Sequence, residues 1–162
     1  MKYGLKIPRV YSGFVEVKAM KALIINGKPR KNRTTIKMLD RAMEGVVEAG
    51  AETELIHLYD YNVKGCVSCF ACKLKDAKTN GVYAIKNELR PIFEKAHEAD
   101  VIVMGSPIYF SYPTGVLRAF MERLMFPINS YNPKSDEDGK MHGSLSDKFV
   151  PTAMIYTMGC PE

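Results

Sequence analysis

Three cysteines, Cys66, Cys69 and Cys72, fall within a span of seven residues. This spacing is too tight for a disulfide framework and is more typical of thiols that bind metal or do redox work in a reducing compartment. A Cys-x2-Cys-x2-Cys run supplies three thiolate ligands of a cubane iron-sulfur cluster, which requires a fourth ligand. The remaining cysteine, Cys160, is far away in the sequence and precedes a proline. The residues leave three interpretations open: an iron-sulfur cluster, redox-active thiols or a zinc site.

Cations, hydroxyls and an amide gather in the turn from Lys28 to Thr35, with the sequence KPRKNRTT. The turn follows an apolar run, Ala22 to Ile25, and precedes apolar residues with helical spacing from Ile36 to Val47. We expect Thr34 or Thr35 to cap this helix. Because the first turn of a helix exposes free N-H groups, a basic turn at this place is a chemically sensible phosphate site, and a solvated basic turn is the alternative.

The net charge of +5 is unevenly distributed, since residues 1 to 37 contain ten Lys or Arg residues and a single acidic residue, Glu16. Such a basic segment attracts nucleic acid, an anionic surface or a phosphorylated ligand. No nucleic-acid recognition motif accompanies it, and no apolar run has the length of a membrane span or the form of a secretory signal. We therefore expect a soluble, cytoplasmic protein that binds neither nucleic acid nor membrane.

Strand and helix patterns alternate along the chain and indicate one α/β domain. The expected strands are Ala22 to Ile25, Glu52 to Leu58, Asp100 to Pro107 and Phe149 to Thr157, and the expected helices run from Ile36 to a stop at Gly50, from about Glu88 to Ala99 and from Pro113 to Met125. This order predicts a parallel sheet covered on both faces. Ligands of such sheets bind beyond the carboxyl ends of the strands, where the loops at 26 to 35, at 106 to 114 and after residue 157 would meet.

Several motifs in the right order resemble the flavodoxin-like NADPH-dependent FMN reductases, in particular the iron-sulfur flavoproteins. NGKPRKNRTT stands where family members read NGSPRKNGNT, and GSPIYF at 105 to 110 where they read GSPIYW. TGVLRAFMERL and IYTMGCPE resemble the third helix and the fourth strand. The resemblance covers residues 20 to 161. It implies a three-layer α/β fold with a parallel sheet in the order 2-1-3-4, in a domain of residues 20 to 162 behind an N-terminal extension of residues 1 to 19, where Tyr11 to Val17 forms a strand or a disordered arm.

The resemblance also implies an FMN site. Its phosphate would be held by the basic turn, where Lys28 and Arg33 depart from the family's serine and glycine, and its ring by the segments after the third and fourth strands. The cofactor-binding residues expected on this basis are Lys28, Arg30, Asn32, Thr34, Thr35, Pro107, Ile108, Tyr109, Phe110, Thr157, Met158 and Gly159.

The metal ligands expected in this branch are Cys66, Cys69 and Cys72. The family's fourth cysteine is missing, because Tyr83 occupies about that place. Cys160 is an alternative fourth ligand, but the second and fourth strands would lie three strand spacings apart, roughly 14 Å. Only a long loop or a second subunit would bring Cys160 to the other three.

The implied activity is transfer of electrons by FMN from NAD(P)H or a donor protein to a quinone, a flavin or another acceptor. A non-enzymatic electron carrier of flavodoxin or iron-sulfur type is the main alternative, and a flavin-free binding domain is a further one. The flavin performs the chemistry, so no catalytic acid or base is assigned, and His97 and His142 are expected at the surface. The flavodoxin-like fold of the family that the chain resembles normally continues past the fourth strand. We expect a homo-oligomer, with the segment 127 to 148 near the interface or over the flavin.

Overall fold

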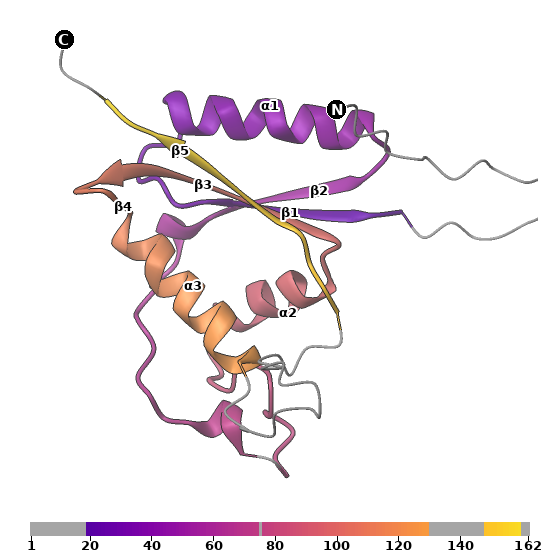
Figure 1. Ribbon diagram of the computed structural model, residues 1–162, viewed down its shortest axis with the longest axis vertical. Coiled ribbons are helices and arrows are strands. Elements are labelled where there is room, and N and C mark those ends of the chain that lie inside the picture. Colours follow the sequence, from indigo (N-terminus) through magenta and orange to yellow (C-terminus); the bar gives the residue numbers. More distant parts are fainter. Residues whose placement is uncertain (1–18, 75, 130–147, 160–162) are drawn as a thin grey trace, which may run out of the picture.

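Four parallel strands form the centre of the computed structural model, which describes residues 19–74, 76–129 and 148–159. The strand order is β2-β1-β3-β5, with the short β4 paired antiparallel to β3 (Figure 1). The elements are β1 (Lys21–Asn26), α1 (Thr34–Glu48), β2 (Glu52–His57), the 3-10 turns η1 (Leu58–Asp60) and η2 (Ala71–Lys73), α2 (Arg90–Glu98), β3 (Val101–Tyr109), β4 (Tyr112–Pro113), α3 (Gly115–Ile128) and β5 (Thr152–Thr157).

The expected α/β architecture is confirmed, and the predicted fourth strand is β5. Helix α1 covers one face of the sheet, while α2 and α3 cover the other (Figure 1). Strand β1 has a continuous buried aliphatic run because both its faces are covered: Leu23 and Ile25 pack toward α2 and α3, and Ala22 and Ile24 pack toward α1. Helix α2 begins at Arg90 with Pro91 in its first turn, where the missing proline N-H removes no helical hydrogen bond.

Three differences from the expected elements are found. Strand β3 continues to Tyr109 and turns back into β4, a pairing that the sequence did not predict. Helix α3 runs past Met125 to Ile128 and contains Pro127. Strand β5 begins at Thr152, not at Phe149. The segment Tyr11 to Val17, most of the segment 127 to 148, His142 and Cys160 lie outside the described residues.

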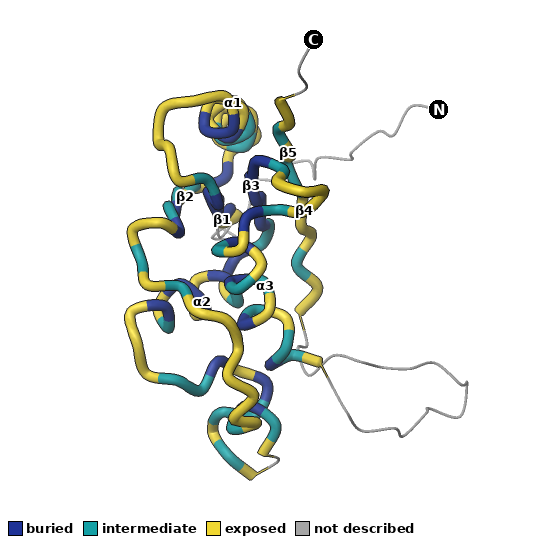
Figure 2. Tube along the Cα trace, turned by 90° about the vertical axis from the view of Figure 1, so that its left-hand side faces the viewer, coloured by how far each residue is buried: buried dark blue, intermediate teal, exposed yellow. Residues whose placement is uncertain are grey.

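The long connection from β2 to α2 descends along α3 and forms a lobe that holds the three cysteines. In Figure 2 this lobe is mostly exposed or intermediate, whereas β1 and β3 are largely buried. The part of the connection that leads from η2 to α2 is anchored in the core by Tyr83, whose ring centroid lies 4.5 Å from that of Phe93. Phe93 in turn stacks on Phe120 of α3 with a centroid separation of 5.0 Å. The cysteine lobe is therefore attached to both helices on this side of the sheet.

Candidate functional site

The carboxyl ends of β1 and β3 are joined by a buried hydrogen-bond network. The Gly27 N-H donates to the Gly105 carbonyl over 2.8 Å, and the Thr114 hydroxyl donates to the Gly27 carbonyl over 2.6 Å. The Thr114 N-H donates to the Ser106 hydroxyl over 3.0 Å. Residue 27 must be glycine for this approach, because a Cβ there would lie 2.8 Å from the Cβ of Leu117. The network fixes the basic turn against the start of α3.

The N-terminus of α1 lies at the same end of the sheet as the carboxyl ends of these strands. Its N-cap is Arg33, with no side-chain cap hydrogen bond, and its first turn contains no acidic residue. The expectation that Thr34 or Thr35 caps the helix is wrong. Thr34 is exposed in the first turn, and the buried Thr35 hydroxyl lies 2.7 Å from the hydroxyl of Thr157 at the end of β5. Thr35 therefore ties α1 to β5. The Ile36 N-H donates to the Arg33 carbonyl over 3.1 Å, but Arg33 does not cap the helix with its side chain, so this helix end suits an anion.

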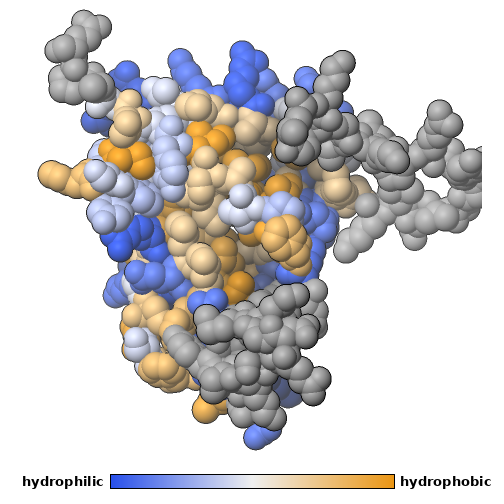
Figure 3. Space-filling view, in the orientation of Figure 1, coloured by the Kyte–Doolittle hydropathy of each residue, from blue (hydrophilic) through white to orange (hydrophobic). Residues whose placement is uncertain are grey.

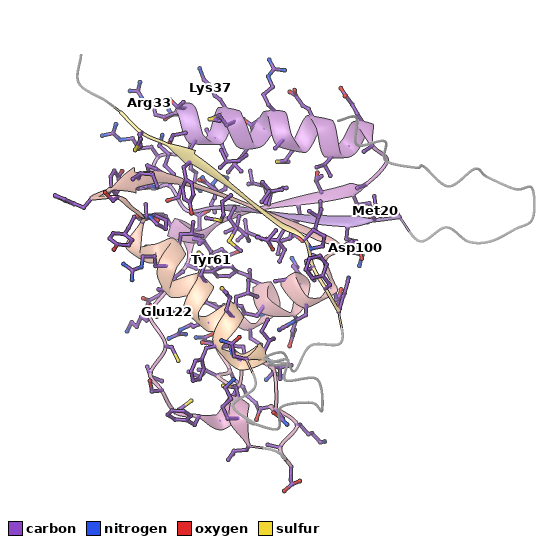
Figure 4. All side chains as sticks on the ribbon, viewed as in Figure 1. Met20, Arg33, Lys37, Tyr61, Asp100 and Glu122 are labelled. Atoms are coloured by element: carbon purple, nitrogen blue, oxygen red, sulfur yellow. The ribbon has the colours of Figure 1, made fainter. Side chains whose placement is uncertain are left out.

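Cations surround this helix end. Partial burial lowers the pKa of Lys28, and the neighbouring charges of Arg30 and Arg33 lower it further. Figure 4 shows Arg33 and Lys37 at the end of α1 that lies near the end of β5. The positive charges of Lys28, Arg30 and Arg33 repel one another, so binding of an anion would stabilise this part of the protein.

Polar residues at the ends of β1 and β2 support the basic turn and were not predicted from the sequence. The buried Asn26 accepts from the Lys28 N-H over 3.0 Å, and its Nδ2 lies 2.8 Å from Nδ1 of His57. Lys31 pairs with Asp60 over 2.6 Å. The only signal in the sequence was a polar residue directly after the apolar run of β1. His57 is half-buried, and its only role in this network is the contact to Asn26.

Aromatic side chains stand on the β3-β4 hairpin at the same edge. Phe110 and Ser111 form its tip, with φ values of 50° and 68°. Both residues are in the left-handed region, which matches a two-residue type I′ turn and costs energy without glycine. The Phe110 side chain is 100% exposed, and Tyr109 and Tyr112 are also exposed. Pro107 is buried and Ile108 is half-buried beneath them.

The end of β5 completes this edge. Thr157 is half-buried at its bond to Thr35, whereas Met158 is 76% exposed and Gly159 is exposed. The predicted phosphate and ring segments are therefore brought to one edge of the sheet. The residues fit FMN, because uncapped helix N-H groups and cations suit its phosphate and exposed aromatic side chains suit its ring.

The cysteine lobe lies along the C-terminal half of α3, away from this end of the sheet, and extends past the end of that helix (Figure 1). Cys66 and Cys69 are exposed and Cys72 is buried. All three line one pocket of about 30 Å³, together with Tyr83 and Arg123. Burial raises the pKa of the Cys72 thiol, against the opposing charge of Lys73. Ser68 and Phe70, between the cysteines, have φ values of 52° and 55°, so the loop is held in an unfavourable backbone conformation.

The three thiols have the donor type of a metal-sulfur group and line one pocket, but their arrangement does not fit such a group. In the described part of the chain no three His, Cys, Asp or Glu side chains are close enough to hold one metal ion. The cavity is about as large as one water molecule, so a cluster would require the cysteine loop to open. Cys160, the alternative fourth ligand, lies outside the described residues.

Two further expectations concern the histidines and the membrane. His97 is half-buried on α2, and burial lowers its pKa. It lies on α2, which leads into the amino end of β3, whereas the hairpin is at the other end of that strand (Figure 1). Among the described helices, none has both the length and the apolar character needed to cross a bilayer.

Comparisons with known proteins agree with this geometry. The family model of the NADPH-dependent FMN reductases matches residues 20–150. An iron-sulfur flavoprotein of Archaeoglobus fulgidus is 40% identical over 104 residues, which are 64% of this chain and 48% of the relative. An iron-sulfur flavoprotein of Methanocaldococcus jannaschii is 35% identical over 64% of this chain and 51% of its own. The chain thus spans about half the length of the curated relatives it matches.

The fold of this chain is also similar to that of a solved structure. An FMN-dependent NADH-azoreductase of Bacillus anthracis, crystallised with FMN, superposes with a TM-score of 0.58 over 86% of this chain and 69% of its own, at 20% identity. Because the family model matches most of its length, this chain belongs to the NADPH-dependent FMN reductase family, and the two relatives are iron-sulfur flavoproteins.

Proposed function

We propose that this protein is an FMN-dependent oxidoreductase that passes electrons from NAD(P)H or a donor protein to a quinone, a flavin or another acceptor. The observation that carries the proposal is the uncapped N-terminus of α1, surrounded by cations and facing the same edge as the exposed hairpin aromatics. FMN, when bound, supplies the two-electron chemistry.

The side chains hold and orient the cofactor in this proposal. Lys28, Arg30 and the α1 N-H groups bind the phosphate dianion, with Asn32 and Thr34 as further donors on the same turn. Thr35 contributes indirectly, because its hydroxyl is engaged with Thr157. Tyr109 and Phe110 cover the isoalloxazine ring, and Pro107, Ile108, Met158 and Gly159 line its remaining edges.

Uptake of two flavins tests this site. We expect the purified protein to bind FMN with a 1:1 stoichiometry and to bind riboflavin, which lacks the phosphate, at least about tenfold more weakly. Quenching of flavin fluorescence measures both affinities. Equal affinities would show that the basic turn does not bind the phosphate, and failure to bind either flavin would contradict the proposed function.

Turnover separates an enzyme from an electron carrier. The FMN-loaded protein is expected to oxidise NADPH or NADH in the presence of a soluble quinone, with the rate followed at the nicotinamide absorption band. Absence of turnover with quinone, flavin and azo acceptors would favour the electron carrier.

We further propose that the cysteine pocket holds an iron-sulfur cluster, which fits the reducing compartment of a cytoplasmic protein. The three thiols on one pocket support this proposal, and the names of the relatives agree with it. Iron and acid-labile sulfide assays on anaerobically purified protein test it, and their absence would contradict it. Residues 20 to 162 form the FMN-binding domain in this proposal, residues 1 to 19 form an extension, and the protein acts as a homo-oligomer.

A further inference from the structure

His57, at the end of β2, contacts the buried side chain that holds the first residue of the basic turn. Asn26 and His57 lie opposite each other in the parallel register of β1 and β2. The Asn26 side chain is 0% exposed, so its amide is shielded from solvent. Its Oδ1 accepts from the Lys28 N-H over 3.0 Å, and its Nδ2 lies 2.8 Å from Nδ1 of His57. One amide therefore links His57 to the backbone of Lys28.

These two contacts determine which nitrogen of His57 carries the proton. A backbone N-H can only donate, so the contact to Lys28 places Oδ1 of Asn26 on that side. The amide Nδ2, which also only donates, then points at His57. Nδ1 of His57 must be an acceptor, which requires a neutral imidazole with its proton on Nε2.

Protonation of Nδ1 would place donors on both sides of the Asn26 amide. The amide has a single oxygen, and the charged imidazolium is a stronger donor than a backbone N-H. The Lys28 N-H would therefore lose its acceptor, which costs free energy in this half-buried place. Gly27 stays held by Gly105 and Thr114, so the freed segment begins at Lys28, the first cation of the basic turn.

The charges around His57 come from three neighbouring segments. They belong to the basic turn, the first half of α1 and η1, and comprise Lys28, Arg30, Lys31, Arg33, Lys37, Asp40 and Asp60. Asp60 pairs with Lys31 over 2.6 Å. None of the ion pairs between described residues includes His57. The hydrogen bond to Asn26 is thus the specific contact that depends on the protonation state of His57.

We propose that His57 is a positioning residue of the FMN site, and that the basic turn binds the phosphate most tightly while His57 is neutral. When Nδ1 takes up a proton from water, the Lys28 N-H is released, the turn loosens and its contacts to the phosphate weaken. Release of FMN is then coupled to uptake of a proton, so the affinity falls as the pH falls through the range of about 5 to 8 in which histidine titrates. This inference rests on the proposed FMN site.

The test compares the wild type with His57→Asn, His57→Leu and the control His97→Asn. Asn places an oxygen acceptor near the position of Nδ1 and does not titrate, whereas Leu has no acceptor. His97 is also half-buried, but it lies on α2 and not at the basic turn. Fluorescence quenching measures the affinities for FMN and riboflavin between about pH 5.5 and 8.

At about pH 8 we expect His57→Leu to bind FMN about tenfold more weakly than the wild type, and His57→Asn to recover most of this loss. At about pH 5.5 the FMN phosphate itself takes up a proton, which weakens binding to every protein. The wild type and His97→Asn should weaken by about a further tenfold, and His57→Asn should not. Riboflavin has no phosphate, so its affinity should not differ between the four proteins.

A pH profile of His57→Asn equal to that of the wild type would overturn the inference. Tighter binding of FMN at low pH by the wild type than by His57→Asn would also overturn it, because the imidazolium would then attract the phosphate. If His57→Leu does not fold, the comparison of the wild type with His57→Asn decides.

The protonation state of His57 can also be measured without FMN. Nitrogen NMR of the FMN-free wild type at about pH 8 should show the imidazole proton of His57 on Nε2, and a proton on Nδ1 would contradict the inference. A wild type that binds no FMN at about pH 8 instead rejects the proposed function itself, and with it this role of His57.

Discussion

Phe110 combines two unfavourable properties in a single residue. Its side chain is completely exposed, and its backbone is left-handed although it has a Cβ. A natural turn of this type usually contains Asn or Gly. Neither feature is explained by stability, and the proposed contact of Phe110 with the flavin would account for both.

The substitution Phe110→Asn should therefore act on stability and flavin affinity in opposite directions. Asn tolerates the left-handed region, so the free energy of unfolding of the FMN-free protein should rise by up to about 1 kcal/mol in urea denaturation. Loss of the ring contact should weaken FMN binding by about fivefold, measured by fluorescence quenching. An unchanged FMN affinity would show that Phe110 does not contact the flavin.

A substitution of Arg30 tests the proposed phosphate site. Arg30→Gln should weaken FMN binding by about tenfold, because a charge-assisted contact to a dianion is lost, and should leave riboflavin binding unchanged. The difference between variant and wild type should shrink as salt is added. Arg41→Gln is the matched control, since Arg41 is exposed further along α1 and pairs with Glu44. Equal weakening of FMN and riboflavin binding would contradict a phosphate contact.

The sequence was more informative about the residues of the proposed FMN site than about the residues that hold them in place. The basic turn is visible in the sequence by its residue types, whereas the ring-binding role of the segment 107 to 110 came from the resemblance to the family motif. Asn26 and His57 were missed as a pair, since their contact joins two strands that are 31 positions apart. Thr35 was assigned to the phosphate by position, but its burial and its bond to Thr157 depend on how β5 packs against α1.

The same distinction between local and distant contacts explains which helices and strands could be predicted from the sequence. The apolar runs predicted the four parallel strands and three helices, because a fully covered sheet requires such runs. The β3-β4 hairpin was missed, since its turn contains neither Gly nor Asn and β4 is only two residues long. Thr114 begins α3 by accepting from the Leu117 N-H over 3.3 Å, and its further bond to Gly27 depends on the tertiary fold.

Thr114 provides a test of how α3 is attached to the proposed flavin site. Thr114→Ala removes the helix cap and leaves the buried Gly27 carbonyl without its hydroxyl donor, so the free energy of unfolding should fall by about 2 kcal/mol. Thr114→Ser keeps the hydroxyl and should lose less than about 1 kcal/mol. Urea denaturation of the FMN-free proteins measures both. Similar losses in the two variants would show that the methyl group, and not the hydroxyl, is responsible.

At the scale of the whole molecule, β5 is the least protected part of the sheet. It pairs with β3 on one side, and no described strand pairs with its other side. Figure 3 shows apolar side chains across the face where β5 lies. Phe149 is 87% exposed, Tyr156 is also exposed, and residues 149 to 159 include no charged side chain. Uncharged edge strands of this kind pair readily with other chains.

The proposed homo-oligomer should therefore depend on the β5 edge. Ala153 is exposed on this strand, and Ala153→Lys adds a charge of the kind that blocks edge pairing. We expect light scattering to give the mass of an oligomer for the wild type and a lower mass for Ala153→Lys, with FMN content unchanged. Ala49→Lys, at the far end of α1, makes the same change at an exposed site away from β5 and should keep the wild-type mass. A monomeric wild type would contradict the oligomer, whereas an oligomer that Ala153→Lys leaves intact would assign its interface to another surface.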